Sequence, residues 1–167
     1  MERLQRGDPR AFDALHARYR AGVWSFLRRH CQDEPTAREL YQDTFFKVWR
    51  GAATWRPGNA VRPWLYRIAA NAARDAHRAR GRQVTLLDLD PDDVGRGVGS
   101  DPVDAVALSR AIEQLPVPLR EAFLLGAVHG LDHQELAVAL DVTPDNARAR
   151  LSRARARLRA LLTAQDS

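Results

Sequence analysis

The stretch LDHQELAVALDVTPDNARARLSRARARLR, residues 131–159, decides the fold of the C-terminal part of the chain. Asp132, followed three residues later by Glu135, is close to a capping box and predicts a helix over HQELAVAL, residues 133–140. Thr143 and Pro144 then supply an N-cap and a first-turn proline for a longer helix. Two helices joined by a three-residue turn predict a helix-turn-helix.

The second helix of this pair is predicted to present a broad cationic surface. Ala147, Leu151, Ala154, Leu158 and Leu161 recur at spacings of three and four and share one face, while arginines cover the rest. In helix-turn-helix proteins the first turns of the second helix enter the major groove, where Asn and Arg can bond adenine and guanine edges. The residues predicted to read duplex DNA are Thr143, Asn146, Arg148, Ala149, Ser152 and Arg153.

Two other interpretations of this helix are a solvated basic helix and a helix that lies on a membrane surface. The capped helix directly upstream favours the helix-turn-helix over a solvated basic helix. The apolar face is mostly alanine and leucine without aromatic residues, which disfavours a membrane-surface helix.

The rest of the chain also shows helical periodicity, and no segment is a convincing strand. In the first half, helices are predicted from Asp8-Pro9 onward, over about 35–50 and over about 63–80. A further helix is predicted over about 103–113. Residues 54–62, TWRPGNAVR, contain Pro-Gly-Asn and predict a loop. The sequence therefore predicts an all-α protein.

Residues 81–104 differ in composition from the segments on either side. GRQVTLLDLDPDDVGRGVGSDPVD holds six aspartates and four glycines without a long apolar period. Such a segment is typical of a flexible acidic linker. We therefore expect two small helical domains, an N-terminal helical bundle over 1–80 and a C-terminal helix-turn-helix domain over 105–167.

The overall charge favours a polyanionic partner. The formal net charge is +5 and the sequence pI is about 10.3. All basic residues except Lys47 are arginines, whose guanidinium groups suit phosphate and guanine edges. A GC-rich genome would also enrich arginine, which explains the total number of arginines but not their clustering.

The sequence also indicates the cellular compartment of the protein. One cysteine, Cys31, cannot form a disulfide framework or a cysteine zinc site within the chain. The N-terminus has no apolar segment of signal-peptide length, and no run approaches the roughly 20 apolar residues of a membrane span. We therefore expect a cytoplasmic protein without membrane insertion of this chain.

The predicted helix at 35–50 has a polar face away from its apolar stripe. A phenylalanine on an acidic, amide-bearing face is a candidate anchor for docking another protein. The alternative is an isolated exposed aromatic side chain, which is common on protein surfaces. The residues of this face are Glu39, Gln42, Asp43, Phe46 and the adjacent Lys47.

The loop at 54–62 and the helix after it combine tryptophans, arginines and an amide. This combination suits single-stranded nucleic acid, because bases stack on aromatic rings and arginines hold the backbone. The alternative is that one of the two tryptophans closes the core. The candidate residues are Trp55, Arg56, Arg62, Trp64, Arg67, Asn71, Arg74, Asp75 and Arg78.

Two blocks of the sequence together resemble a known family. RELYQDTFFKVWR (38–50), followed by WRPGNAVRPWLYRIAANAARDAHRARGR (55–82), resembles region 2 of bacterial sigma factors. LPVPLREAFLLGAVHGLDHQELAVALDVTPDNARARLSRARARLRALL (115–162) resembles region 4. The short acidic linker, with no domain between the blocks, is similar to that of the extracytoplasmic-function (ECF) group of the sigma-70 family.

The resemblance implies a role for each surface. The face around Phe46 matches the family's surface for the clamp of core RNA polymerase. The loop 55–62 and the following helix match the segment that melts and reads the minus-10 element, and Asn71 and Asp75 match the group's Asn-x-x-x-Asp pattern. The arginine helix matches the reader of the minus-35 element. The linker matches a segment threaded toward the polymerase active centre.

The implied partners are core RNA polymerase, promoter DNA and a dedicated anti-sigma factor, with no cofactor, metal or catalytic residue. Three positions depart from the family pattern. Arg38-Glu39 stands where two acids are usual, Asp132 replaces the usual Ser or Thr cap, and Asp141 replaces the glycine common in the turn. We expect Asp132 to cap equally well and Asp141 to tolerate left-handed backbone geometry at a modest cost.

Two other classes of function compete with this interpretation. A nucleic-acid enzyme lacks a recognisable site, because the carboxylates are scattered and His129 and His133 are separated by a turn. A free-standing helix-turn-helix regulator shares the C-terminal motif but needs no polymerase surface. It would bind operator duplex alone, whereas a sigma factor needs core enzyme for tight, specific binding.

Overall fold

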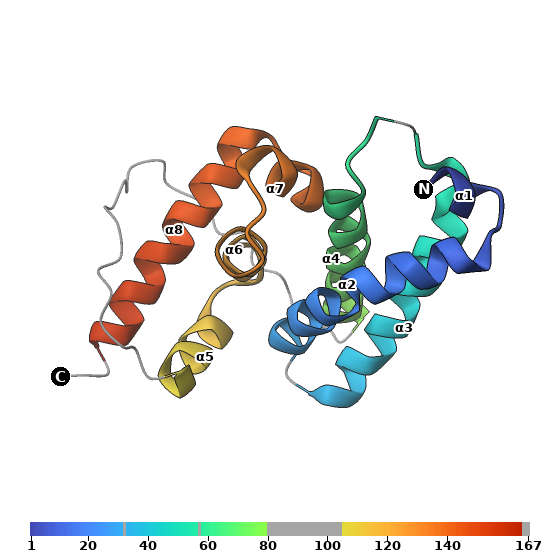
Figure 1. The fold of residues 1–167 in the computed structure, drawn as a ribbon. Helices are drawn as coiled ribbons and strands as arrows, with labels where there is room; N and C mark the ends of the chain where they lie inside the picture. Colours follow the sequence, from blue (N-terminus) through green and yellow to red (C-terminus); the bar gives the residue numbers. More distant parts are fainter. Residues whose placement is uncertain (32, 57, 80–104, 165–167) are drawn as a thin grey trace.

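The computed structural model describes residues 1–31, 33–56, 58–79 and 105–164, and within these the predicted all-α fold is confirmed (Figure 1). No strand occurs among these residues. A 3₁₀ turn at Ala52–Thr54 follows the third helix and a π-helical turn at Leu124–Val128 follows the sixth. The predicted linker, 81–104, lies outside the described residues. The helices are α1 Glu2–Gln5, α2 Pro9–His30, α3 Glu34–Gly51, α4 Val61–Ala79, α5 Ala105–Gln114, α6 Val117–Phe123, α7 His133–Leu140 and α8 Pro144–Thr163.

In the N-terminal half, helices α1–α4, aspartate side chains cap the starts of α2 and α3. Asp8 accepts a hydrogen bond from the Arg10 amide and begins α2, as predicted. Asp33 accepts from the Thr36 amide at 2.8 Å and begins α3. Helix α4 begins at Val61, two residues before the predicted start, so that Pro63 lies in its first turn. The short α1 was not predicted.

In the C-terminal half, helices α5–α8, the predicted helix-turn-helix is confirmed. Asp132 accepts from the amides of Gln134 and Glu135, and the Glu135 side chain accepts from the Asp132 amide, which completes a capping box. Asp141 has φ 58° and ends α7 in the left-handed conformation expected of it. Thr143 caps α8 through the Asn146 amide.

Close approach of α8 to the π-helical turn depends on a glycine. A Cβ atom built on Gly126 would lie 2.9 Å from Cδ2 of Leu151, well inside ordinary van der Waals contact. Leu151 is buried with Ala147, Ala154 and Leu158, so the apolar stripe predicted for α8 is confirmed. A side chain at Gly126 would force the Leu151 side chain to shift.

The two halves share one hydrophobic core, and α4 lies at their junction (Figure 1). On one side α4 packs on α2 and α3, and on the other it packs along α7. Leu65 and Ala69 are buried on α4, and Tyr66, Ala70 and Ala73 are buried as well. A helix with partners on two sides buries two faces.

Candidate polymerase and DNA interfaces

The polar face of α3 points to solvent around an exposed aromatic side chain. Phe46 is 57 % exposed, and the guanidinium of Arg50 lies 5.7 Å from its ring centroid. Lys47 pairs with Asp43 at 2.7 Å on the same face. The adjacent Phe45 is 5 % exposed and packs in the core, so the helix is firmly oriented and Phe46 is held outward. The exposure predicted for Phe46 is confirmed.

A groove lies beside this face, between α2 and α3. Its volume is about 590 Å³, and Gln42 of the predicted docking face is one of the residues that line it. Burial raises the pKa of the Tyr41 hydroxyl in this groove. The contribution of α2 could not be predicted, because it depends on how α2 pairs with α3. The lining residues are Arg20, Ala21, Trp24, Arg38, Tyr41 and Gln42.

The two tryptophans predicted to stack on bases are both partly buried. Trp64 packs against the shared core from the first turn of α4. Trp55 follows the 3₁₀ turn, and its carbonyl accepts a hydrogen bond from the Gln5 side chain. Its indole Nε1 is buried without a hydrogen-bond partner among the described residues. Arg56 is exposed, and the loop residue that follows it lies outside the described residues.

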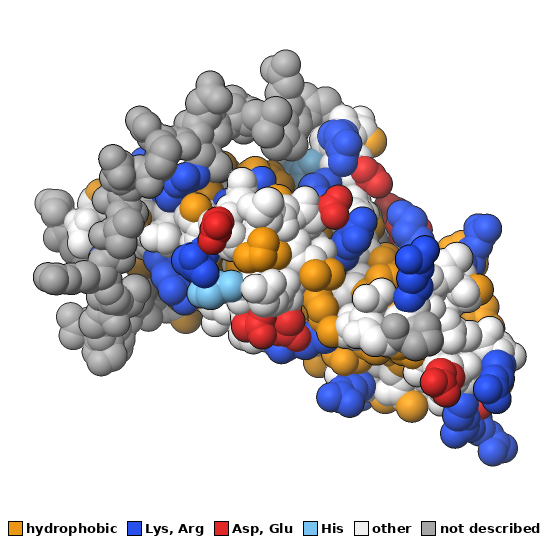
Figure 2. Space-filling view, turned by 90° about the horizontal axis from the view of Figure 1, so that it is seen from above, with side chains coloured by type: hydrophobic (Ala, Val, Ile, Leu, Met, Phe, Trp, Pro, Cys, Tyr) orange, Lys and Arg blue, Asp and Glu red, His pale blue; other side chains and the backbone are white. Residues whose placement is uncertain are grey.

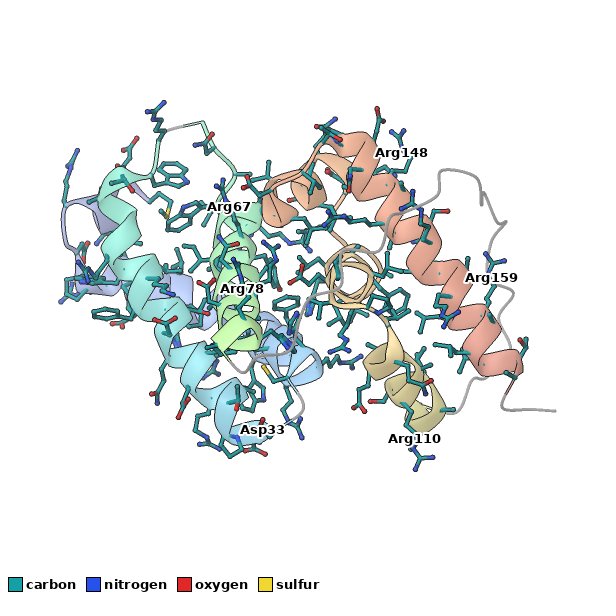
Figure 3. All side chains as sticks on the ribbon, turned by 180° about the vertical axis from the view of Figure 1, so that it is seen from behind. Asp33, Arg67, Arg78, Arg110, Arg148 and Arg159 are labelled. Atoms are coloured by element: carbon teal, nitrogen blue, oxygen red, sulfur yellow. The ribbon has the colours of Figure 1, made fainter. Side chains whose placement is uncertain are left out.

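The arginines predicted to hold single-stranded DNA are largely engaged by the C-terminal half. Arg62 pairs with Glu135 at 3.4 Å and also donates to the carbonyls of His129 and Gly130. Arg67 pairs with Asp141 at 3.4 Å. The C-terminal half therefore packs against part of this face of α4, which the sequence could not show. Figure 3 shows Arg67 and Arg78 along α4.

The other polar residues of the predicted face form local contacts along α4. Asn71 is exposed, and its Oδ1 accepts from Nη1 of Arg74 at 2.9 Å. Arg78 pairs with Asp75 at 3.2 Å, and both side chains are well exposed. Asn71 and Asp75 therefore keep their polar groups at the helix surface.

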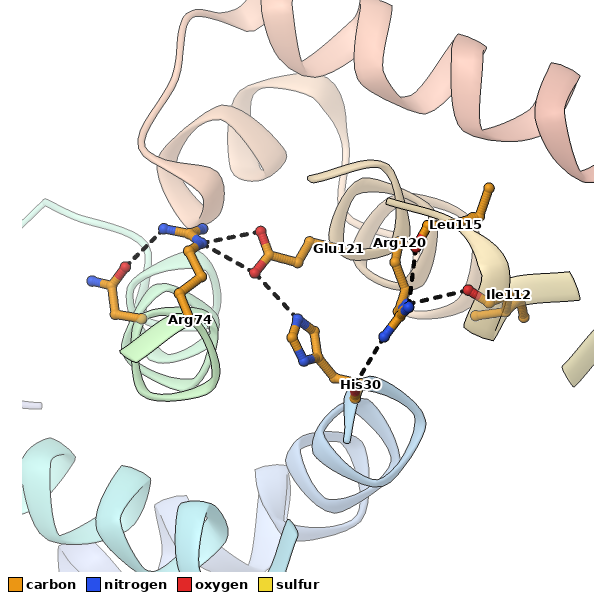
Figure 4. A network of polar contacts seen from close by, with 7 residues as sticks. His30, Arg74, Ile112, Leu115, Arg120 and Glu121 are labelled. Carbon is orange, nitrogen blue, oxygen red and sulfur yellow. Dashed lines mark hydrogen bonds and ion pairs between the residues drawn. The ribbon is translucent and has the colours of Figure 1, made fainter. Parts of the chain in front are cut away.

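A buried polar network ties the two halves together at Glu121 (Figure 4). The Glu121 side chain is 1 % exposed and accepts from Nε of Arg74 at 3.0 and 3.1 Å. His30 Nε2, from the end of α2, lies 3.3 Å from Oε1 of the same carboxylate. The neighbouring Arg120 donates to the His30 carbonyl at 3.2 Å and to the Leu115 carbonyl at 3.0 Å.

The sequence offered little signal for this network. Arg120 and Glu121 stand in a run, LREAF, in which adjacent charges are typical of a solvated helix face. Buried charges need partners from elsewhere in the fold. Here those partners are His30 and Arg74, which precede them by more than 40 residues.

A partly buried histidine, His129, lies at the same junction. Nδ1 of His129 lies 3.4 Å from the Tyr66 hydroxyl, and the two rings are in contact. Burial lowers the pKa of His129 to about 4, with smaller contributions from the positive charges of Arg29 and Arg62. Burial likewise raises the pKa of Tyr66. Both groups are therefore neutral at neutral pH.

The first turns of α8 present the residues predicted to read duplex DNA. Thr143, Asn146 and Arg148 are exposed. Arg148 forms a solvent-exposed ion pair with Asp145 at 3.1 Å. Ala149, Ser152 and Arg153 are partly exposed on the same turns. Arg148 lies near the beginning of α8, away from Arg159 at the other end of the helix (Figure 3).

One arginine of α8 turns toward α4 instead. Arg150 lines a cavity of about 400 Å³ that also contains Arg74, Arg78 and Asp141. Burial lowers the pKa of Arg150, and the nearby positive charges of Arg74 and Arg153 act in the same direction. Its Nε finds no hydrogen-bond partner among the described residues.

The molecular surface carries basic side chains over both halves. Figure 2 shows Lys and Arg side chains spread across one face, with hydrophobic side chains exposed between them. Within the described part of the chain, no helix combines the length and the apolar character needed to cross a bilayer.

Both parts of the chain match family models. Residues 15–83 match Sigma-70 region 2, and residues 105–158 match Sigma-70, region 4. The first match includes α3 and α4, and the second contains the helix-turn-helix.

Several sigma factors are similar to the chain over most of its length. The RNA polymerase sigma factor CarQ of Myxococcus xanthus is 37% identical over 97% of this chain and 95% of the relative. The RNA polymerase sigma-H factor of Pseudomonas aeruginosa is 32% identical over 93% of this chain and 88% of the relative. The ECF RNA polymerase sigma-E factor of Escherichia coli is 30% identical with the same coverage.

Solved structures agree with these relatives. CnrH, solved in complex with the cytosolic domain of CnrY, matches with a TM-score of 0.76 and 28% identity over 98% of this chain and 94% of that chain. The sigma factor RpoE from Bartonella quintana, solved with the anti-sigma factor NepR, matches with a TM-score of 0.74 and 25% identity over 92% of this chain and 97% of that chain. With region 2 and region 4 both present and sigma factors similar along almost its whole length, the chain belongs to the ECF group of the sigma-70 family of RNA polymerase sigma factors.

Proposed function

We propose that this sigma factor docks on core RNA polymerase through the α3 face, reads minus-35 duplex with α8 and captures the melted minus-10 strand with residues 55–78. The observation that carries the proposal is that two candidate binding surfaces lie on different parts of the molecule. The chain holds both an exposed aromatic anchor, Phe46, and exposed groove-reading turns that include Arg148, on separate parts of its surface. A free-standing regulator needs only the second of these surfaces.

The chemistry of α8 supports duplex reading. Asn146 and Arg148 can bond base edges, while arginines farther along the helix can hold phosphates. Neutralising several phosphates releases counterions, so binding should weaken steeply as salt rises. The proposed role is binding without catalysis, in the cytoplasm where promoter DNA and core enzyme meet.

An anti-sigma factor is the third proposed partner. The sigma factor RpoE from Bartonella quintana was solved with an anti-sigma factor, and its fold matches this chain over most of its length. The groove between α2 and α3 lies next to the α3 face. A regulator that covered this region would also block docking on polymerase.

Reconstituted transcription tests the proposal directly. The purified protein is added to sigma-free core RNA polymerase with a genomic DNA library as template, and the 5′ ends of the transcripts are sequenced. We expect discrete start sites that share two upstream motifs about one and three helical turns back. A folded protein that neither co-elutes with core enzyme nor yields start sites would support the free-standing regulator instead.

A further inference from the structure

Three arginine side chains line one cavity at the meeting point of α4, α6 and α8. Arg74 and Arg78 belong to α4, and Arg150 belongs to α8. Arg78 is largely exposed and pairs with Asp75, whereas the other two side chains are partly buried. The cavity has a volume of about 400 Å³. Small-molecule sites typically have volumes of roughly 300–1,000 Å³, so this cavity is large enough for a small ligand.

Two of the three guanidinium groups keep buried N–H groups without a partner. Arg74 uses Nε for Glu121 and Nη1 for Asn71, and its Nη2 is buried with no hydrogen-bond partner in the described part of the chain. Nε of Arg150 is buried and unpaired in the same sense. Burial lowers the pKa of Arg150, and the Glu121 carboxylate opposes this only in part. A charge that loses water without gaining partners costs free energy.

The two carboxylates at the cavity already have other partners. Glu121 accepts from Nε of Arg74 and lies 3.3 Å from Nε2 of His30 (Figure 4). Asp141 pairs with Arg67, which does not line the cavity. The acceptors for the two unpaired N–H groups therefore come from water or from a bound anion.

A phosphate monoester has the chemistry that these groups require. It carries a charge between about −1.5 and −2 near neutral pH and offers three acceptor oxygens. Guanidinium groups bind such oxygens through short, charge-assisted hydrogen bonds. The cavity also has an apolar wall, formed by Val117, Pro118 and Val142, against which a ring can pack. The cavity thus combines a cationic end for a phosphate with an apolar wall for an organic group.

We propose that this cavity binds a small organic phosphate, with Arg74 and Arg150 holding the phosphate and the apolar wall packing against the organic part. The inference goes beyond the proposed function, because Arg150 is not among the residues proposed to bind polymerase or promoter DNA. Backbone phosphates of DNA offer similar oxygens but carry a single negative charge each. A monoester carries nearly twice that charge, which favours it beside two unpaired guanidinium groups.

The test uses the full chain without polymerase and measures binding by isothermal titration calorimetry at low salt. The probes are 5′-AMP, inorganic phosphate and adenosine. Arg150→Gln removes the unpaired guanidinium at the cavity. Arg155→Gln is the matched control, because it removes the same charge from an exposed position of the same helix that does not line the cavity.

We expect 5′-AMP to bind wild type at a single site and more tightly than inorganic phosphate, while adenosine gives no binding heat. Arg150→Gln should weaken 5′-AMP binding by about tenfold or more, as the loss of a charge-assisted hydrogen bond gives. Arg155→Gln should stay within about twofold of wild type, since exposed charges are largely screened. Circular dichroism verifies helix content. If Arg150→Gln prevents folding, Arg150→Lys keeps the charge without the fork and should show a smaller loss of affinity.

Nuclear magnetic resonance locates the ligand within the molecule. The Nε–H signal of Arg150 is identified by its absence from the spectrum of Arg150→Gln. It should shift as 5′-AMP is added to wild type, because a phosphate oxygen replaces water as its acceptor. The Nε–H signal of Arg155, identified in the same way, should not move.

Four results would overturn the proposal. No binding of 5′-AMP at millimolar concentrations would mean that the cavity holds water only. Equal weakening by Arg150→Gln and Arg155→Gln would mean attraction by net charge without a site. Binding of adenosine or inorganic phosphate as tight as that of 5′-AMP would deny the cavity its combined recognition of phosphate and ring. A shift of the Arg150 signal with an oligodeoxythymidine that has hydroxyl ends, and not with 5′-AMP, would assign the arginine to a DNA strand.

Discussion

Arg74 on α4 donates from Nε to both carboxylate oxygens of Glu121 on α6, at 3.0 and 3.1 Å, across a separation of 47 residues. The carboxylate is buried, whereas the Arg74 side chain as a whole is 21 % exposed. The pair joins a helix of the region 2 match to a helix of the region 4 match. Its removal should therefore reveal how strongly the two halves stabilise each other.

Glu121→Ala should destabilise the protein by about 3 kcal/mol, because it leaves Arg74 and His30 without their buried partner. Chemical denaturation followed by circular dichroism measures the change in free energy of unfolding. The matched variant Glu113→Ala alters an exposed carboxylate on α5 and should stay within about 0.5 kcal/mol of wild type. Equal stabilities for the two variants would mean that the Glu121 network contributes nothing net.

Arg148→Ala and Arg153→Ala should each weaken binding to minus-35 duplex by about 1–3 kcal/mol if the side chain contacts a guanine edge. Promoter binding by the reconstituted holoenzyme, measured at fixed salt, reports the change. Arg110→Ala serves as the control, since Arg110 is exposed on α5 outside the helix-turn-helix. Unaltered promoter binding by both α8 variants would remove this face of α8 from DNA reading.

Phe46→Ala should weaken binding to core RNA polymerase while leaving the melting temperature nearly unchanged, because the ring is 57 % exposed. The neighbouring variant Phe45→Ala provides the contrast. Phe45 is 5 % exposed, so its truncation should destabilise the fold by about 3–5 kcal/mol. Co-elution with core enzyme and thermal denaturation separate the two effects. Early melting of Phe46→Ala would contradict an exposed docking role.

Stability should fall between about pH 6.5 and pH 4 because of His129. Its pKa is lowered to about 4 in the folded protein, so the unfolded chain binds the proton first as pH falls. The contribution of neutral His129 is present above pH 6.5 and is lost as pH drops through 4. Since the side chain is partly exposed, we expect a loss of about 1–2 kcal/mol after solvent screening.

Denaturation at a series of pH values measures this dependence. His129→Gln should flatten the pH dependence over that window, whereas His133→Gln alters an exposed histidine and should leave it unchanged. Identical pH profiles for His129→Gln and wild type would assign the acid sensitivity to other groups.

Asp141→Gly should stabilise the helix-turn-helix by about 0.5–1 kcal/mol, because glycine adopts the observed φ of 58° without a Cβ penalty. The substitution also removes the pair with Arg67, but both side chains are largely exposed and the pair contributes little. Asp141→Ala, which loses the pair without gaining backbone freedom, is the control and should be less stable than wild type. Thermal denaturation of wild type and the two variants gives the order of their stabilities.

Local features of the fold could be predicted from the sequence because their causes are local. The caps at Asp8, Asp132 and Thr143 act on amides two or three residues away, and each begins the predicted helix. The apolar spacing of α8 identified its buried stripe correctly, and the outward position of Phe46 followed from the same periodicity. These features need only the helical repeat and hydrogen bonds between near neighbours.

The candidate site was predicted less completely. The exposed turns of α8 and the polar face of α3 lie where the sequence placed them, while Arg62, Arg67 and Arg74 are engaged rather than free. Periodicity distinguishes an apolar face from a polar face. It does not distinguish a polar face in water from one that meets complementary charges of a distant segment.

The sequence by itself determined that the chain is helical, where its main helices begin, and that it carries a helix-turn-helix with a cationic second helix. Only the tertiary structure decided that α4 packs against helices of both halves, with the Arg74–Glu121 ion pair at their junction. The physical reason is the distance along the chain over which each interaction acts. Helix propensity, capping and amphipathic spacing act within a few residues, whereas a buried ion pair exists only after packing has excluded water around partners far apart in the chain.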